Sequence, residues 1–111
     1  MKSAAGFSIV LITAPDLKTA RRLAQAALKA KFVACVNLVS KIESHYWWQG
    51  KIERAEEVVM LVKTRAGLAG AVGQAVKAAH SYTTPSIMVV PVEQVDPDYH
   101  RWIVEETSQN D

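Results

Sequence analysis

The stretch from Ala34 to Thr64 constrains the fold more than any other part of the chain. It contains two strand-like segments, 34–48 and 51–64, separated by Gln49-Gly50. Two such segments around a two-residue turn that contains glycine are typical of a tight β-hairpin. Ser40-Lys41 interrupts the apolar pattern of the first segment and predicts a bulge. The fifteen residues of that segment would span about 50 Å if straight, which exceeds the width of a small domain.

A hairpin of this length carries three aromatic side chains near its tip, Tyr46, Trp47 and Trp48. If the hairpin extends beyond the domain, these side chains form an exposed patch that soluble monomers rarely leave bare. The sequence therefore predicts that neighbouring copies of the chain cover the hairpin. The alternative is a kink at Ser40 that folds the hairpin over its own sheet.

The composition indicates one globular domain over residues 1–111. Half of the 111 residues are hydrophobic and the formal net charge is +2. Arg21-Arg22 is the one basic doublet, and it falls in a helical pattern, so we expect no nucleic-acid partner. The apolar runs are too short for a membrane helix or a secretory signal, and we expect no membrane association. The single cysteine, Cys35, excludes an intrachain disulfide and favours a reducing, cytoplasmic location.

The segments around the hairpin complete a recognisable order of elements. The apolar run 7–12 predicts a strand buried on both faces, as does 58–62 within the hairpin. Asp16 is a suitable N-cap for a helix that ends near Lys31, and Thr64 for a second helix. A strand over 87–90 follows, with Pro91 at an edge. Asp96-Pro97 predicts the start of a last helix.

This order of strands and helices favours an α+β ferredoxin-like sandwich, βαββαβ, with a long hairpin between its second and third strands and an extra C-terminal helix. Both crossing helices would cover one face of the sheet. Gly70 and Gly73 interrupt the second helix, where they either allow a close approach to the sheet or are simply tolerated.

The motifs of the chain, taken together, resemble those of the CutA family of divalent-cation tolerance proteins. The resemblance extends from Ile9 to Trp102. It implies a ferredoxin-like protomer in a tight homotrimer whose hairpins cross between subunits, a link to copper and other divalent cations, and no established reaction. The trimer also resembles signalling proteins of the PII type, which bind small effectors between subunits. The matching residues are Thr13-Ala14-Pro15-Asp16, Ala34-Cys35-Val36-Asn37-Leu38, Tyr46, Trp48, Gly50-Lys51-Ile52-Glu53, Val62-Lys63-Thr64, His80, Tyr82, Pro91-Val92, Tyr99 and Trp102.

Two residues are candidate metal ligands. A Cys35 thiolate would suit Cu(I), and the His80 imidazole would suit Cu(II), zinc or nickel. Each also has a purely structural interpretation. Cys35 lies in an apolar strand, where a free cysteine is usually a small buried hydrophobe. His80 lies at a helix end, where a cation stabilises the terminal carbonyl groups. Some bacterial family members have a cysteine where this chain has Ile12, and a second histidine where it has Ala79.

A second candidate site is a polar pocket between subunits with an aromatic wall. It would be formed by Trp48, Lys51, Glu53, Lys63 and Tyr82 and would suit a small anion or carboxylate. Lys51 and Glu53 are two residues apart and share one strand face. In the alternative interpretation they form an ion pair across the trimer seam.

No catalytic residues are predicted, because the sequence has no nucleophile triad, phosphate loop or H-E-x-x-H motif. We expect a non-enzymatic cytoplasmic homotrimer that binds copper or another divalent cation weakly and has no organic cofactor. The alternatives are a PII-like trimer that senses a small organic effector and a structural scaffold for a protein partner.

Overall fold

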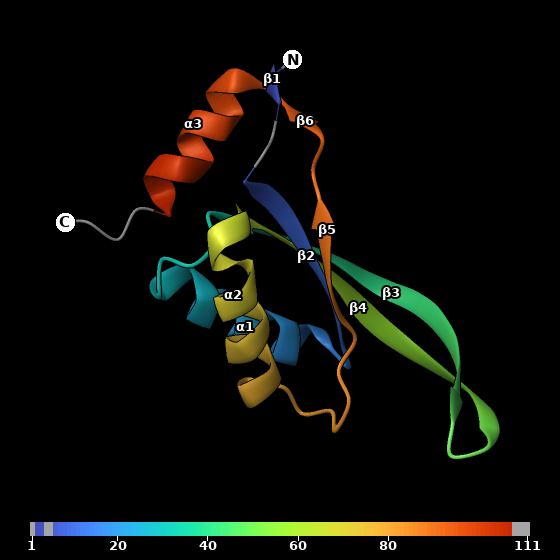
Figure 1. Ribbon diagram of the computed structural model, residues 1–111. Coiled ribbons are helices and arrows are strands. Elements are labelled where there is room, and N and C mark those ends of the chain that lie inside the picture. Colours follow the sequence, from blue (N-terminus) through green and yellow to red (C-terminus); the bar gives the residue numbers. More distant parts are fainter. Residues whose placement is uncertain (1, 4–5, 108–111) are drawn as a thin grey trace.

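Figure 1 shows the computed structural model, which describes residues 2–3 and 6–107. The predicted domain, 1–111, also includes residues 1, 4–5 and 108–111, which lie outside the described residues. Among the described residues, no helix has the length and apolar character needed to cross a membrane. The elements are β1 (Lys2–Ser3), β2 (Phe7–Ala14), α1 (Leu17–Lys29), β3 (Cys35–Trp48), β4 (Lys51–Arg65), α2 (Ala66–Ala79), β5 (Ile87–Pro91), β6 (Gln94–Val95) and α3 (Pro97–Glu106).

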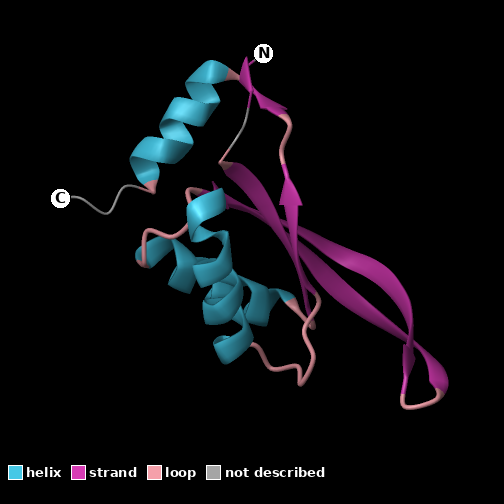
Figure 2. Ribbon diagram, viewed as in Figure 1, coloured by secondary structure: helices cyan, strands magenta, loops and turns pink. Residues whose placement is uncertain are grey.

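The main sheet has four antiparallel strands in the order β3-β4-β2-β5. Helices α1 and α2 lie together on one face of this sheet (Figures 1 and 2). This arrangement is the predicted α+β ferredoxin-like sandwich, and α3 is the predicted additional helix. β5 is an edge strand that ends at Pro91, as expected for a residue without an N–H to donate. The short pair β1-β6 was not predicted.

The core lies between the sheet and the two helices. Alternate side chains of β2 and β4 point to this layer and are buried, with Ile12 and Met60 among the largest. The intervening side chains on the opposite face, such as Leu11 and Leu61, are only half-buried. The prediction that 7–12 and 58–62 are buried on both faces is therefore wrong for the single chain, because both helices cover the same face.

The hairpin has the predicted turn and bulge. Trp48 pairs with Lys51, and Gln49 and Gly50 have φ values of 51° and 80°, as a two-residue hairpin turn requires. The register shifts between Val39 and Ile42, so the bulge is confirmed at the predicted position.

The outer half of the hairpin has only two strands. β2 pairs with β4 from Val58 to Arg65, whereas residues 51–57 of β4 pair with β3 alone. The hairpin extends past the helices (Figure 1), and the molecule measures 45 × 29 × 21 Å. Three or more strands are usually needed for a stable sheet, so this outer half lacks support within its own chain.

The first helix is capped as predicted. The Asp16 carboxylate accepts a hydrogen bond from the Thr19 N–H at 2.7 Å, and hydrogen bonding with Thr19 lowers the pKa of Asp16. The helix ends at Lys29, two residues before the predicted end. Lys31 has a φ of 66°, a left-handed conformation that a helix cannot continue.

The predicted cap of the second helix is wrong. The N-cap of α2 is Arg65, and its side chain makes no capping hydrogen bond. Thr64 remains in β4, because the pairing of β4 with β2 continues to Arg65 opposite Phe7. The Thr64 hydroxyl is fully buried and donates instead to the Phe32 carbonyl at 2.5 Å.

The last helix is attached to the start of α2. Asp96 caps α3 by accepting hydrogen bonds from two backbone N–H groups, as predicted. The Arg65 guanidinium donates to the Thr107 hydroxyl at 2.9 Å and to the Thr107 carbonyl at 2.6 Å. A cation at a helix C-terminus stabilises it. Phe7 and Ile103 form a second small core beneath α3.

Gly70 and Gly73, two of the three glycines of α2, differ from the turn glycine Gly50 in their backbone requirements. A Cβ at Gly70 would meet nothing within 4 Å, and one at Gly73 would meet Ile87 at an ordinary contact distance of 3.7 Å. Neither glycine is therefore needed for helix packing in the single chain. Gly50 also has open space but a positive φ.

We therefore expect opposite effects from one substitution at two positions. Gly70→Ala should stabilise the protein by about 0.5–1 kcal/mol, because alanine restricts the unfolded chain and favours the helix. Gly50→Ala should destabilise it by about 1 kcal/mol through backbone strain. Urea unfolding measures the free energy of unfolding of both variants. Changes of the same sign would contradict the different backbone requirements of the two glycines.

Candidate functional site

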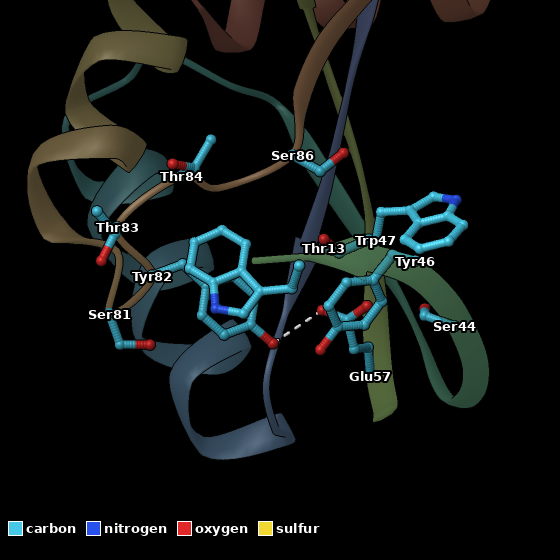
Figure 3. Close-up of a pocket in the computed structure, with 11 residues that line it drawn as sticks. Thr13, Ser44, Tyr46, Trp47, Glu57, Ser81, Tyr82, Thr83, Thr84 and Ser86 are labelled. Atoms are coloured by element: carbon cyan, nitrogen blue, oxygen red, sulfur yellow. Dashed lines mark hydrogen bonds between the residues drawn. The ribbon is translucent and has the colours of Figure 1, made fainter. Parts of the chain in front are cut away.

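A cavity of about 710 Å³ opens between the outer part of the hairpin and the loop 80–86 that follows α2. Most of its lining side chains carry hydroxyl groups or aromatic rings (Figure 3). Its volume falls in the range of small-molecule sites. The lining residues are Thr13, Ser44, Tyr46, Trp47, Trp48, Glu57, Ser81, Tyr82, Thr83, Thr84 and Ser86.

His80 anchors the loop that forms one wall of this pocket. The Tyr82 N–H donates to His80 Nδ1 at 3.0 Å, so Nε2 carries the proton of the neutral ring. Nε2 lies 2.7 Å from the Thr13 carbonyl and donates to it. Both ring nitrogens of this buried histidine are thus engaged. Its role in the structure is to join the loop to the end of β2.

Tyr82 and Glu57 point toward each other inside the pocket (Figure 3). The Tyr82 hydroxyl donates to Glu57 Oε2 at 2.8 Å. Burial raises the pKa of Tyr82, and the hydrogen bond to Glu57 raises it further. The phenol therefore keeps its proton at neutral pH and remains a donor to the carboxylate.

The two faces of the outer hairpin have different surroundings. Ser44, Tyr46 and Trp48 alternate along β3, share one face and line the pocket. Trp47 also borders the cavity, although it is paired with Ile52 across the hairpin and strand alternation assigns these two side chains to the other face. They are the most exposed large apolar residues that the structure describes, at 71% and 66%. The predicted exposure of the hairpin aromatics is confirmed for the single chain.

The structure brings together two of the five residues predicted for the pocket, Trp48 and Tyr82. Lys51 and Glu53 share the hairpin face of Trp48, as their spacing predicts, but they do not line the cavity. Lys63 is twelve residues further along β4, about 40 Å from Lys51. Its Nζ lies 5.6 Å from the centre of the Tyr99 ring. The cavity of one chain therefore lacks the predicted cation for an anionic ligand.

The two predicted metal ligands lie apart within the chain. Cys35 is half-buried and pairs with Lys63 on one side of β4, whereas His80 bonds to Thr13, which pairs with Val59 on the other side. Among the described residues, no group of three or more histidine, cysteine or acidic side chains could hold a metal ion. The part of the chain that the structure describes therefore contains no built metal site.

Glu57 and most of the hydroxyl side chains of the pocket were not predicted as site residues. Glu57 is buried, whereas the adjacent Glu56 is exposed, as expected for neighbours that point to opposite faces of a strand. Strand alternation indicates the face of Glu57. It cannot indicate that a loop distant in sequence covers that face.

We expect His80→Ala to destabilise the protein by about 1–3 kcal/mol, because it leaves a backbone carbonyl and an N–H without their partner. His45→Ala should change stability by less than about 0.5 kcal/mol, because that ring is exposed and bonds only to Glu43 among the described residues. Chemical denaturation compares the two variants. Similar losses would argue against an anchoring role for His80.

Comparison with known proteins places this geometry in a family. The family model of the CutA1 divalent ion tolerance protein matches residues 8–106. The divalent-cation tolerance protein CutA of Archaeoglobus fulgidus is 46% identical over 98 residues, which are 88% of this chain and 95% of that protein. Protein CutA of Mus musculus is 38% identical over 96 residues, 86% of this chain but only 54% of the mouse protein.

The fold agrees with the sequence comparison. The solved structure of the periplasmic divalent cation tolerance protein CutA from Archaeoglobus fulgidus superposes with a TM-score of 0.90. The two are 44% identical in sequence, and the match covers 92% of this chain and 99% of the solved one. The described chain therefore belongs to the CutA1 family of divalent-cation tolerance proteins.

Proposed function

We propose that the protein acts as a non-enzymatic homotrimer in the tolerance of divalent metal ions, copper included, and binds these ions weakly. The family membership supports the general role in divalent-cation tolerance. The observation that carries the proposal is the uncovered apolar face of the sheet. In a trimer, neighbouring copies would cover this face and support the two-stranded outer half of each hairpin.

The uncovered face crosses all four strands of the main sheet. Both helices lie on its other side, so its central side chains are only half-buried and those on the edge strands are exposed. An apolar patch of this kind is typical of a protein–protein interface. Its apolar residues are Ile9, Leu11, Val39, Val59, Leu61, Met88 and Val90.

Weak metal binding follows from the separation of the candidate ligands. A metal ion at His80 would have to replace one of the two hydrogen bonds that engage its ring nitrogens. Cys35 is a single thiol without a second predicted ligand beside it. One or two ligands per ion give low affinity, in contrast to the four ligands of a structural metal site.

We further propose a cytoplasmic location, since the single cysteine suits a reducing compartment. The solved relative from Archaeoglobus fulgidus is described as periplasmic. Cell fractionation with antibody detection tests this proposal directly, and recovery of the protein with periplasmic markers would contradict it.

The trimer is tested by two substitutions on neighbouring residues of β5. Val90→Lys places a charge on the uncovered face and should reduce the assembly to smaller species. Val89→Lys changes a residue of similar exposure, 51% against 42%, whose side chain belongs to the helix-covered face. It should leave the assembly intact. Light scattering coupled to gel filtration gives the masses, and an unchanged mass for Val90→Lys would count against this interface.

Metal binding is tested by calorimetric titration of the protein with Cu²⁺, and with Cu⁺ in the absence of oxygen. We expect saturable but weak binding that Cys35→Ser reduces. His80→Ala should reduce both metal affinity and stability, so its unfolding curve must be measured beside its binding curve. Titrations without saturation would remove the metal-binding part of the proposal.

A further inference from the structure

We propose that the pocket between the hairpin and the loop 80–86 binds a small organic ammonium ion, whose N–H donates to Glu57 while its apolar part lies against Tyr46 and Trp48. This inference goes beyond the proposed role in metal tolerance. In the proposed trimer, a neighbouring copy would also lie against this hairpin. The negative charge, the aromatic walls and the hydroxyl groups all come from one copy.

Glu57 has a carboxylate oxygen that accepts no hydrogen bond from the described residues. The residue is only 8% exposed, and its Oε2 accepts the Tyr82 hydroxyl at 2.8 Å. Within the described residues, no donor reaches the other carboxylate oxygen, Oε1. No fully buried side-chain oxygen or nitrogen there lacks a partner. Oε1 therefore retains contact with the cavity, where a nearly buried carboxylate oxygen gains most from a charged donor.

The aromatic rings around Glu57 favour the same kind of ligand. Tyr46 and Trp48 come from the hairpin face that borders the cavity, and Tyr82 comes from the facing loop. Aromatic rings around an organic cation attract it through their electron-rich faces, most strongly when water is excluded. The neighbouring hydroxyl groups can bind polar substituents of the ligand (Figure 3).

The charges argue against an anion and against a bare metal ion. Of the described residues that line the pocket, Glu57 alone carries a formal charge. Lys51 and Glu53 on the same hairpin face carry opposite charges, so together they leave the local balance negative. A divalent metal ion needs several charged or strongly donating ligands, whereas the pocket offers one carboxylate and neutral hydroxyl groups.

Three ligands with one phenol ring and different charges test this proposal. Tyramine carries an ammonium group, 4-ethylphenol is neutral, and 4-hydroxyphenylacetate is an anion. Isothermal calorimetry on the wild-type protein should give the highest affinity for tyramine. A tenfold excess of CaCl₂ should leave that affinity unchanged. Absence of tyramine binding, equal or tighter binding of the anion, or displacement by Ca²⁺ would overturn the proposal.

Two matched variants identify the acceptor. Glu57→Gln keeps the shape and an oxygen for Tyr82 but removes the charge, and should weaken tyramine binding about tenfold. Glu56→Gln removes the same charge from the adjacent, exposed residue and should have no effect. Equal affinities of the two variants would overturn the assignment of Glu57.

A substitution outside the core tests the aromatic wall with little risk of unfolding the protein. Trp48→Leu changes a partly exposed hairpin residue and should weaken tyramine binding more than 4-ethylphenol binding, because only the cation interacts with the charge of the ring face. Equal weakening of both ligands would contradict a cation site. Light scattering on the same samples reports the trimer, so failure of this proposal is distinguishable from failure of the proposed assembly.

Discussion

The pairing of β4 is the constraint on which the remaining structure depends. Its second half lies between β2 and β3 in the centre of the sheet, whereas its first half pairs with β3 alone. The central half is held by the helical layer that packs on it. The outer half has neither a third strand nor a covering helix. A two-stranded extension of this kind is marginal in water, and the proposed trimer would supply the support that one chain lacks.

The candidate site lies where these two halves meet. The last pair between β2 and β4 joins Ala14 to Val58, and Glu57 is the first residue of β4 beyond it. The space that β2 no longer fills is bordered by the loop after α2, which His80 joins to the end of β2. The end of β2 thus leaves room for the cavity. Glu57 of β4, the first residue beyond the β2 pairing, lines it.

Local chemistry explains which parts of this fold could be predicted from the sequence. The turn at Gln49-Gly50, the bulge beside Lys41 and the cap at Asp96 depend on residues close in sequence, and all three are found. Thr64 has the chemistry of a cap, but strand pairing with β2 keeps it in the sheet. The tertiary contacts of the sheet therefore outweigh the local preference of Thr64 for a helix cap.

The site was less predictable because it joins segments distant in sequence. Trp48 and Tyr82 were correctly placed in one pocket, but Lys63 lies at the other end of β4 from the cavity. The hydrogen bond between Tyr82 and Glu57 connects residues twenty-five positions apart. The engagement of both His80 nitrogens depends on Thr13, sixty-seven positions away. The local sequence pattern indicates neither of these hydrogen bonds.

A single chain leaves its hairpin and the outer face of its sheet without cover, and we propose that neighbouring copies supply it. Sedimentation equilibrium of the wild-type protein, measured over a range of micromolar concentrations, tests it most directly. We predict a species with three times the mass of the chain that persists on dilution. A folded species with the mass of one chain would contradict it.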